Sequence, residues 1–147
     1  MQRFSDGQTV GYLPRDIRND EERGQDPKYA MPPGIHKSLE LFGVWQQKER
    51  APLRIIYVVE SPFAVMRFHE MGLAAVSPYG WSVSEQQAEI ICQLPRRAVC
   101  LPDADKRQAF EQSAYVLAKR MWARCPEMPE GVSDPENLTA EQIRNLT

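Results

Sequence analysis

The segment "LRIIYVVE" at 53–60 restricts the fold more than any other part of the sequence. Its apolar residues follow one another almost without interruption, whereas a strand with one wet face would alternate apolar and polar residues. A strand of this kind is buried on both faces, as in a parallel sheet that helices cover on each side. Two shorter apolar runs, at 73–78 and 96–103, are further candidate strands.

The segments that separate these runs carry helix signals. Ser61 can cap a helix that has Pro62 in its first position and ends at Gly72. Ser84 and Gln87 have the three-residue spacing of a capping box. Later helices are expected over 106–125 and from 139 onward, with a short fourth strand before residue 126. This alternation predicts an α/β fold with a largely parallel central sheet of about four strands and helices on both faces.

Residues 1–52 differ in amino-acid composition from the rest of the chain. They are polar, and the stretch "RNDEERGQDPKYAMPPG" at 18–34 is too rich in charge, Pro and Gly for regular structure. One helix is expected within this region, over 36–47. We therefore predict an N-terminal extension at 1–52 and one domain at 53–147.

Charge and cysteine content exclude several classes of protein. The net charge is −2 and the pI is about 5.7, so no overall positive field attracts nucleic acid. Cys92, Cys100 and Cys125 lack metal-ligand spacing, which argues against zinc and predicts a reducing, cytoplasmic location. No run approaches 18 apolar residues, so no membrane partner is expected.

Three acidic residues follow two of the predicted strands. Glu60 ends the first strand, and Asp103 and Asp105 follow the third. Carboxyl ends of parallel strands meet at one edge of a sheet, where polar ligands collect. If the segment is extended, Asp103 and Asp105 point the same way and repel each other unless a cation intervenes. Carboxylates in this arrangement suit Mg²⁺, with Glu60 as a further ligand or as a general acid or base.

The Asp-x-Asp pair has other interpretations. The pair could simply favour the start of the following helix through the helix dipole. A calcium EF-hand loop is excluded, since its sixth and twelfth positions hold Gln108 and Ala114. A phosphatase of the haloacid-dehalogenase type is disfavoured by Lys106 and Arg107 directly after the pair.

The order of these motifs resembles the TOPRIM domain of bacterial DnaG-type DNA primases. The resemblance is carried by "IIYVVESPFAVM", "GLAAVSPYGWSVSEQQ", "CLPDADKRQAF" and "MPEGVSDPENL", in that order. Upstream, "VGYLPR", "DPKY" and "HKSLELFGV" are similar to the segment that precedes TOPRIM in primases. The resemblance runs from about residue 10 to residue 138 and implies a TOPRIM-like α/β fold behind a small primase-like extension.

The resemblance also implies roles for individual residues. Glu60 takes the position of the catalytic glutamate, and Glu60, Asp103, Asp105, Asp134 and Glu136 would form the metal site for Mg²⁺ or Mn²⁺. Arg15, Lys28 and Lys37 match basic positions that line the track of template and nucleotide. The implied activity is synthesis of RNA primers in DNA replication. The implied partners are single-stranded DNA template, ribonucleotides and a helicase or other replication protein.

Some positions depart from the family pattern. Ser61 replaces a glycine, Ala64 replaces an aspartate that could bind metal, and Ala104 replaces the glycine between the two aspartates. Trp81 stands where a small or hydroxylated residue is usual. Two alternatives therefore stay open: a catalytically degenerate module that binds nucleic acid or nucleotide, and a metal-dependent TOPRIM nuclease.

Overall fold

A computed structural model of the protein describes residues 1–27, 29–50 and 52–147. Four strands form one sheet in the order β2-β1-β3-β4, and every neighbouring pair is parallel. The strands are β1 (Leu53–Val59), β2 (Ala75–Val76), β3 (Pro95–Leu101) and β4 (Trp122–Arg124). The α/β fold with a parallel four-stranded sheet is as the sequence predicts.

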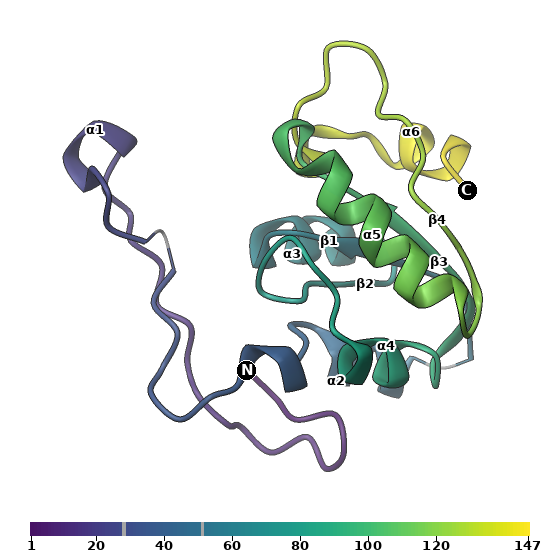
Figure 1. The fold of residues 1–147 in the computed structure, drawn as a ribbon, viewed down its shortest axis with the longest axis horizontal. Helices are drawn as coiled ribbons and strands as arrows, with labels where there is room; N and C mark the ends of the chain where they lie inside the picture. Colours follow the sequence, from purple (N-terminus) through teal and green to yellow (C-terminus); the bar gives the residue numbers. More distant parts are fainter. Residues whose placement is uncertain (28, 51) are drawn as a thin grey trace.

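Short helices connect and flank the strands (Figure 1). The α-helices are α1 (Asp20–Arg23), α2 (Val44–Glu49), α3 (Pro62–Glu70), α4 (Glu85–Ile91), α5 (Arg107–Ala118) and α6 (Ala140–Asn145). The 3₁₀ turns are η1 (Lys37–Leu39), η2 (Ala104–Lys106) and η3 (Pro135–Asn137). Among the described residues, none of these helices has the length and apolar character needed to cross a bilayer.

The predicted helix starts are confirmed. The Ser61 hydroxyl accepts a hydrogen bond from the Ala64 N–H at 3.0 Å, with Pro62 in the first helical position. Complete capping boxes begin α4 at Ser84 and α6 at Thr139. These side chains satisfy N–H groups that a helix start would otherwise leave without partners.

Two predicted helices are shorter than expected. The helix over 106–125 ends at Ala118, and residues 122–124 instead pair with β3 as β4. The reason is tertiary, because β3 would otherwise present an unpaired edge to solvent. The helix over 36–47 is split into η1 and α2, since Phe42 pairs with Ser77 and Gly43 takes a φ of 79°.

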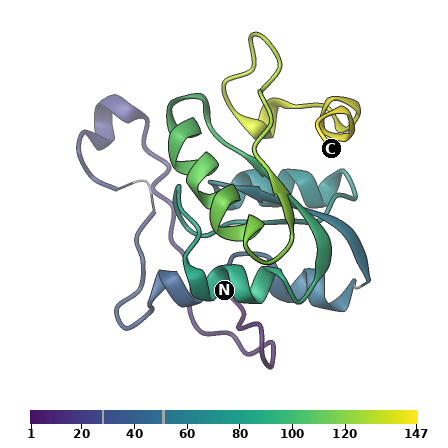
Figure 2. The same cartoon turned by 45° about the vertical axis from the view of Figure 1, so that its right-hand side comes forward.

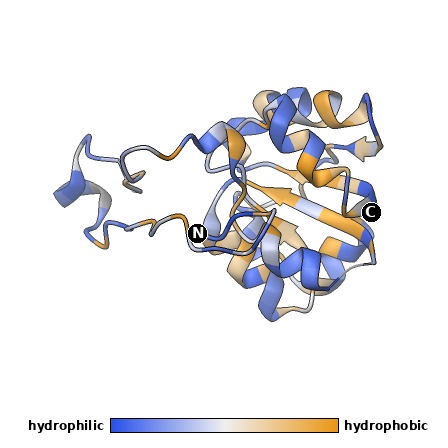
Figure 3. Ribbon diagram, turned by 90° about the horizontal axis from the view of Figure 1, so that it is seen from below, coloured by the Kyte–Doolittle hydropathy of each residue, from blue (hydrophilic) through white to orange (hydrophobic). Residues whose placement is uncertain are grey.

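Both faces of the sheet are buried, as the apolar run predicts. On β1, Ile56 and Val58 pack on one face, against a cluster that includes residues of α2, α4 and α5. Tyr57 and Val59 pack on the opposite face, against a cluster that includes residues of α3 and α6. Figure 2 shows α5 lying across the strands in a second view, and Figure 3 shows the apolar residues gathered around the sheet.

The N-terminal extension has two parts. Around α1 it forms an arm that reaches away from the sheet and is mostly hydrophilic (Figures 1 and 3). Nearer the domain it joins the core, where Leu41 and Val44 are each 1% exposed. The buried amide of Gln87 holds it there by donating to the carbonyl oxygens of Lys37 at 2.7 Å and Glu40 at 2.8 Å. The predicted boundary at residue 52 remains a prediction.

Gly43 is required both by its backbone conformation and by the space around it. A Cβ at this position would lie 2.8 Å from Val65 Cγ1 and 3.2 Å from the Ala75 carbonyl oxygen. We expect Gly43→Ala to lower the free energy of unfolding by about 2–4 kcal/mol, since positive-φ strain and overpacking add. Denaturant unfolding followed by circular dichroism measures the loss.

Gly72→Ala is the matched control for this substitution. Gly72 has a similar φ of 74°, but a Cβ there would meet nothing within 4 Å. Only the backbone strain of about 1–2 kcal/mol should be lost. Equal losses in the two variants would show that the contact with Val65 does not matter.

Candidate active site

The acidic residues lie at the carboxyl edge of the sheet because β1 and β3 are parallel and in register. Their pairing continues to Val59 opposite Leu101. Glu60 directly follows Val59, and Asp103 follows Leu101 by two residues. The two strand ends therefore deliver these carboxylates to the same edge, as the sequence predicts.

A third loop brings two further acids to this edge. The Ala104 N–H donates to the Ser133 carbonyl oxygen at 2.8 Å, which fastens the loop before η3 to the Asp-x-Asp segment. The Ser61 hydroxyl donates to Glu136 Oε2 at 3.4 Å, which joins η3 to the start of α3. Asp134 itself precedes η3 as its N-cap residue.

The charges of these acids act on one another. Burial, the largest cause, and the nearby carboxylates together raise the pKa of Asp103 from 3.8 to about 7. The carboxylates act in decreasing order from Glu60 through Asp134 and Glu136 to Asp105. A half-buried carboxyl among like charges ionises reluctantly. We call Glu60, Asp103, Asp134 and Glu136 the acidic cluster.

Asp105 lies at the margin of this cluster. The segment is not extended as expected, because Asp105 falls within the 3₁₀ turn η2 and its side chain is exposed. It pairs with Lys106, whose hydrogen bond lowers the pKa of Asp105. The expected repulsion between two neighbouring aspartates is therefore relieved by a lysine on one of them.

The capping interpretation of Asp103 finds no hydrogen bond to support it. Asp103 occupies the N-cap position of η2, but its side chain makes no capping hydrogen bond there. Its environment is that of a partly buried acid among acids, which is more typical of a ligand-binding site than of a helix start.

The acidic cluster fits a metal ion in donor type and charge, although its side chains are not arranged as a three-ligand site. In donor type and charge it suits Mg²⁺ or Mn²⁺, because every donor is a carboxylate and a dication would relieve the repulsion that raises the pKa of Asp103. Within residues 1–27, 29–50 and 52–147, however, no three His, Cys, Asp or Glu side chains are arranged to hold one ion. Mg²⁺ characteristically takes only one or two protein carboxylates and completes its shell with water and substrate phosphates.

A cavity of about 430 Å³ opens beside Glu60, between the N-terminal extension and the domain. Its lining residues are Leu13, Pro27, Tyr29, Met31, Lys37, Glu60, Ser61, Pro62, Tyr79, Gly80 and Trp81. Most of this wall is apolar or aromatic, with Lys37, Glu60 and Ser61 as its polar members. Such a composition is typical of a small-molecule site.

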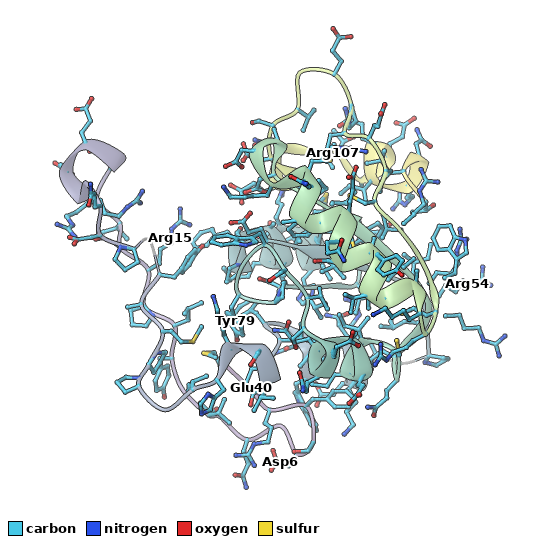
Figure 4. All side chains as sticks on the ribbon, viewed as in Figure 1. Asp6, Arg15, Glu40, Arg54, Tyr79 and Arg107 are labelled. Carbon is cyan, nitrogen blue, oxygen red and sulfur yellow. The ribbon has the colours of Figure 1, made fainter. Side chains whose placement is uncertain are left out.

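The three basic residues predicted for the nucleic-acid track differ in position. Lys37 lines the cavity together with Glu60. Arg15 lies outside the lining, with its guanidinium 3.7 Å from the ring centroid of Phe63 at the start of α3 (Figure 4). Lys28 lies outside the described residues.

Other residues of the site were not predicted from the sequence. Lys106 reaches the acidic cluster, since Glu60 and Asp103 add to the effect of Asp105 in raising the pKa of Lys106. Tyr29 and Tyr79 line the cavity from opposite parts of the chain. The position of Lys106 next to Asp105 was a sequence signal that could have identified it as a site residue. Nothing in the sequence marked Tyr29 and Tyr79 as site residues.

The protein is therefore an α/β protein with a parallel sheet, and its acids and cavity lie at the carboxyl edge, where such sheets collect polar ligands. No model of a known protein family matches the chain, and no curated protein matches it by sequence. Solved structures do match it, and primase structures are among them.

Three of these structures illustrate the similarity. The zinc-binding and RNA polymerase domains of the Aquifex aeolicus primase give a TM-score of 0.78 at 23% identity, covering 99% of this chain and 38% of that one. A DNA primase domain from Pseudomonas aeruginosa gives a TM-score of 0.71 at 26% identity, covering 93% of this chain and 44% of that one. A DnaG primase catalytic domain bound to ssDNA gives a TM-score of 0.71 at 23% identity, covering 95% of this chain and 46% of that one.

The protein therefore has the TOPRIM-containing fold of the DnaG primase catalytic core, as the motif order predicts. It spans less than half the length of the solved structures that it matches.

The raised pKa of Asp103 predicts a pH-dependent cost in metal-free protein. The ordinary pKa of 3.8 becomes about 7 on folding, so stability from this group is full below pH 4 and is lost as pH rises toward 7. The variant Asp103→Asn should therefore become more stable relative to the wild type as the pH rises over this range. Because solvent screens a half-buried carboxyl, we expect a gain of about 2–4 °C in Tm at pH 7.5.

Thermal unfolding in EDTA at pH 4, 5.5 and 7.5 measures this gain. Asp105→Asn is the control, because Asp105 is exposed and its pKa is lowered by Lys106. The variant Asp105→Asn should show no gain in Tm over the wild type at any of these pH values. If Asp103→Asn tracks the wild type throughout, burial and the neighbouring acids do not raise the pKa of Asp103 as described.

Proposed function

We propose that this chain is the TOPRIM part of a DNA primase-like nucleotidyltransferase. It would act in the cytoplasm during replication, synthesising RNA primers on single-stranded DNA with Mg²⁺ or Mn²⁺. The single observation that carries the proposal is the meeting of acids from three loops at the carboxyl edge of the sheet, beside a nucleotide-sized cavity. The fold shared with primase catalytic cores, one of them bound to ssDNA, supports it.

The acidic cluster would hold the metal. Glu60 and Asp103 are its central ligands in this proposal, with Asp105, Asp134 and Glu136 around them. When bound, a divalent ion lowers the charge on the triphosphate and favours attack on the α-phosphate. Glu60 can also accept a proton from the attacking hydroxyl, since it lines the cavity directly.

The basic residues would hold the nucleic acid and the nucleotide. Lys37 lies in the cavity wall, where its ammonium can bind phosphate oxygens. Arg15 lies at the join between the arm and α3, and would contact the template backbone without reading bases. The same role is proposed for Lys28. A helicase or another replication protein remains a proposed partner.

One observation favours the alternative of a degenerate binding module. Ala64, where primases place an aspartate, is 2% exposed and packs with Tyr57 and Val65. This position supplies no ligand, and a carboxylate introduced there would be buried. A module that binds nucleotide or strand without turnover would keep the cavity and lose only the chemistry.

Metal binding and catalysis can be tested on the same variants. We expect the double variant Asp103→Asn with Asp105→Asn to weaken Mn²⁺ binding by at least about 10-fold in calorimetry. Glu60→Gln should lower incorporation of labelled ribonucleotides on single-stranded DNA by about 100-fold or more. Asp6→Asn is the matched control, because Asp6 is an acid that lies far from this edge (Figure 4).

The outcomes separate the three candidate functions. Primer synthesis by the wild type supports the primase assignment, and strand cleavage instead supports a nuclease. Binding without turnover supports the degenerate module. Unchanged Mn²⁺ binding in the double variant would contradict the primase and nuclease functions, since both need a metal ion at these acids.

A further inference from the structure

Trp81 is an unusually exposed aromatic side chain for one in a cavity wall. It is 53% exposed, it belongs to neither hydrophobic core cluster, and it lines the 430 Å³ cavity and a smaller neighbouring one. Burial of its indole therefore contributes little to folding. We propose that Trp81 is the platform on which the base of the bound nucleoside triphosphate stacks. This inference rests on the proposed function and adds to it the residue that positions the substrate base.

The size and lining of the cavity suit one nucleotide. A volume of about 430 Å³ lies in the range of small-ligand sites and is too small for a duplex. The extension supplies Tyr29 and Met31, and the loop after β2 supplies Tyr79 and Trp81. A flat heterocycle fits between such walls, because every base has a π-face that stacks on an aromatic ring.

The charges around Trp81 suit the phosphates of the same ligand. The Lys106 ammonium lies 5.6 Å from the centroid of the indole ring. The Lys37 ammonium lies beside the neighbouring Gly80, 3.9 Å from where a Cβ on that residue would be. Glu60 lines the same cavity. A base on Trp81 would thus have its phosphates within reach of two lysines and of the acidic cluster, a combination that matches a nucleoside triphosphate.

The loop that carries Trp81 is held in place by the domain. The Ser77 hydroxyl donates to the Glu60 carbonyl oxygen and accepts from the Tyr79 N–H at 3.1 Å. The Gln87 amide donates to the Pro78 carbonyl oxygen at 3.2 Å. Tyr79 takes a φ of 59°, a strained conformation that persists only where the surroundings impose it. The backbone that leads to Trp81 is therefore held in place relative to the end of β1.

Calorimetric titration of the full chain with two probes tests this role. Mg²⁺–ATP carries a base, whereas inorganic triphosphate with Mg²⁺ carries only the phosphates. We expect Trp81→Ala to weaken ATP binding by about 10-fold, within the range of base–aromatic stacking. Triphosphate binding should change by less than about 2-fold, and Trp81→Phe should restore most of the ATP affinity, because a phenyl ring also stacks.

Trp122→Ala is the matched control. Trp122 is 43% exposed but lies on β4, stacked on Arg97 and away from the cavity. It should leave the affinity for both probes unchanged. Circular dichroism checks that each variant is folded.

The results distinguish failure of this inference from failure of the proposed function. If the wild type binds both probes and Trp81→Ala binds ATP as tightly or more tightly, Trp81 is no platform, and the proposed function stands. If Trp81→Ala weakens both probes equally, the residue acts on the phosphates and the stacking role is overturned. If the wild type binds neither probe, both proposals are overturned.

Discussion

The parallel pairing of β1 with β3 is the constraint on which the rest of this protein depends. The two strands are paired up to Val59 and Leu101, so the residues that follow them leave the sheet at the same edge. A shift of one residue would turn the apolar side chains to the opposite faces and move Glu60 relative to Asp103. Because both faces of β1 are buried, packing fixes the register, and the register in turn fixes the site.

The acidic cluster illustrates a conflict between stability and function. Burial, together with like charges from three loops, raises the pKa of Asp103 to about 7, which is unfavourable for folding at neutral pH. The core of the sheet must offset this repulsion in metal-free protein. A dication and a triphosphate would relieve it, so ligand binding and stability are coupled in this arrangement.

The cavity lies where the N-terminal extension meets the domain, and polar contacts help to hold that junction. The amide of Gln87 bonds three carbonyl oxygens, of Lys37, Glu40 and Pro78, and so joins the extension to the loop that carries Tyr79 and Trp81. Phe42 and Ser77 add a backbone bridge at the same junction. The Gln87 amide therefore joins segments that lie about 40 residues apart in the sequence, at the junction beside the cavity.

Local sequence was sufficient for the features that local physics controls: the apolar strands, the caps at Ser61 and Ser84, and the alternation that makes a parallel sheet. It was sufficient also for the convergence of Glu60 and Asp103, because this follows from parallel strand ends. It did not determine the end of α5, the turn that separates Asp105 from Asp103, or the cavity between distant segments. The first depends on pairing at the edge of the sheet, the second on a neighbouring lysine and the third on contacts between distant segments. These interactions compete with local conformational preference and form only when the whole domain packs.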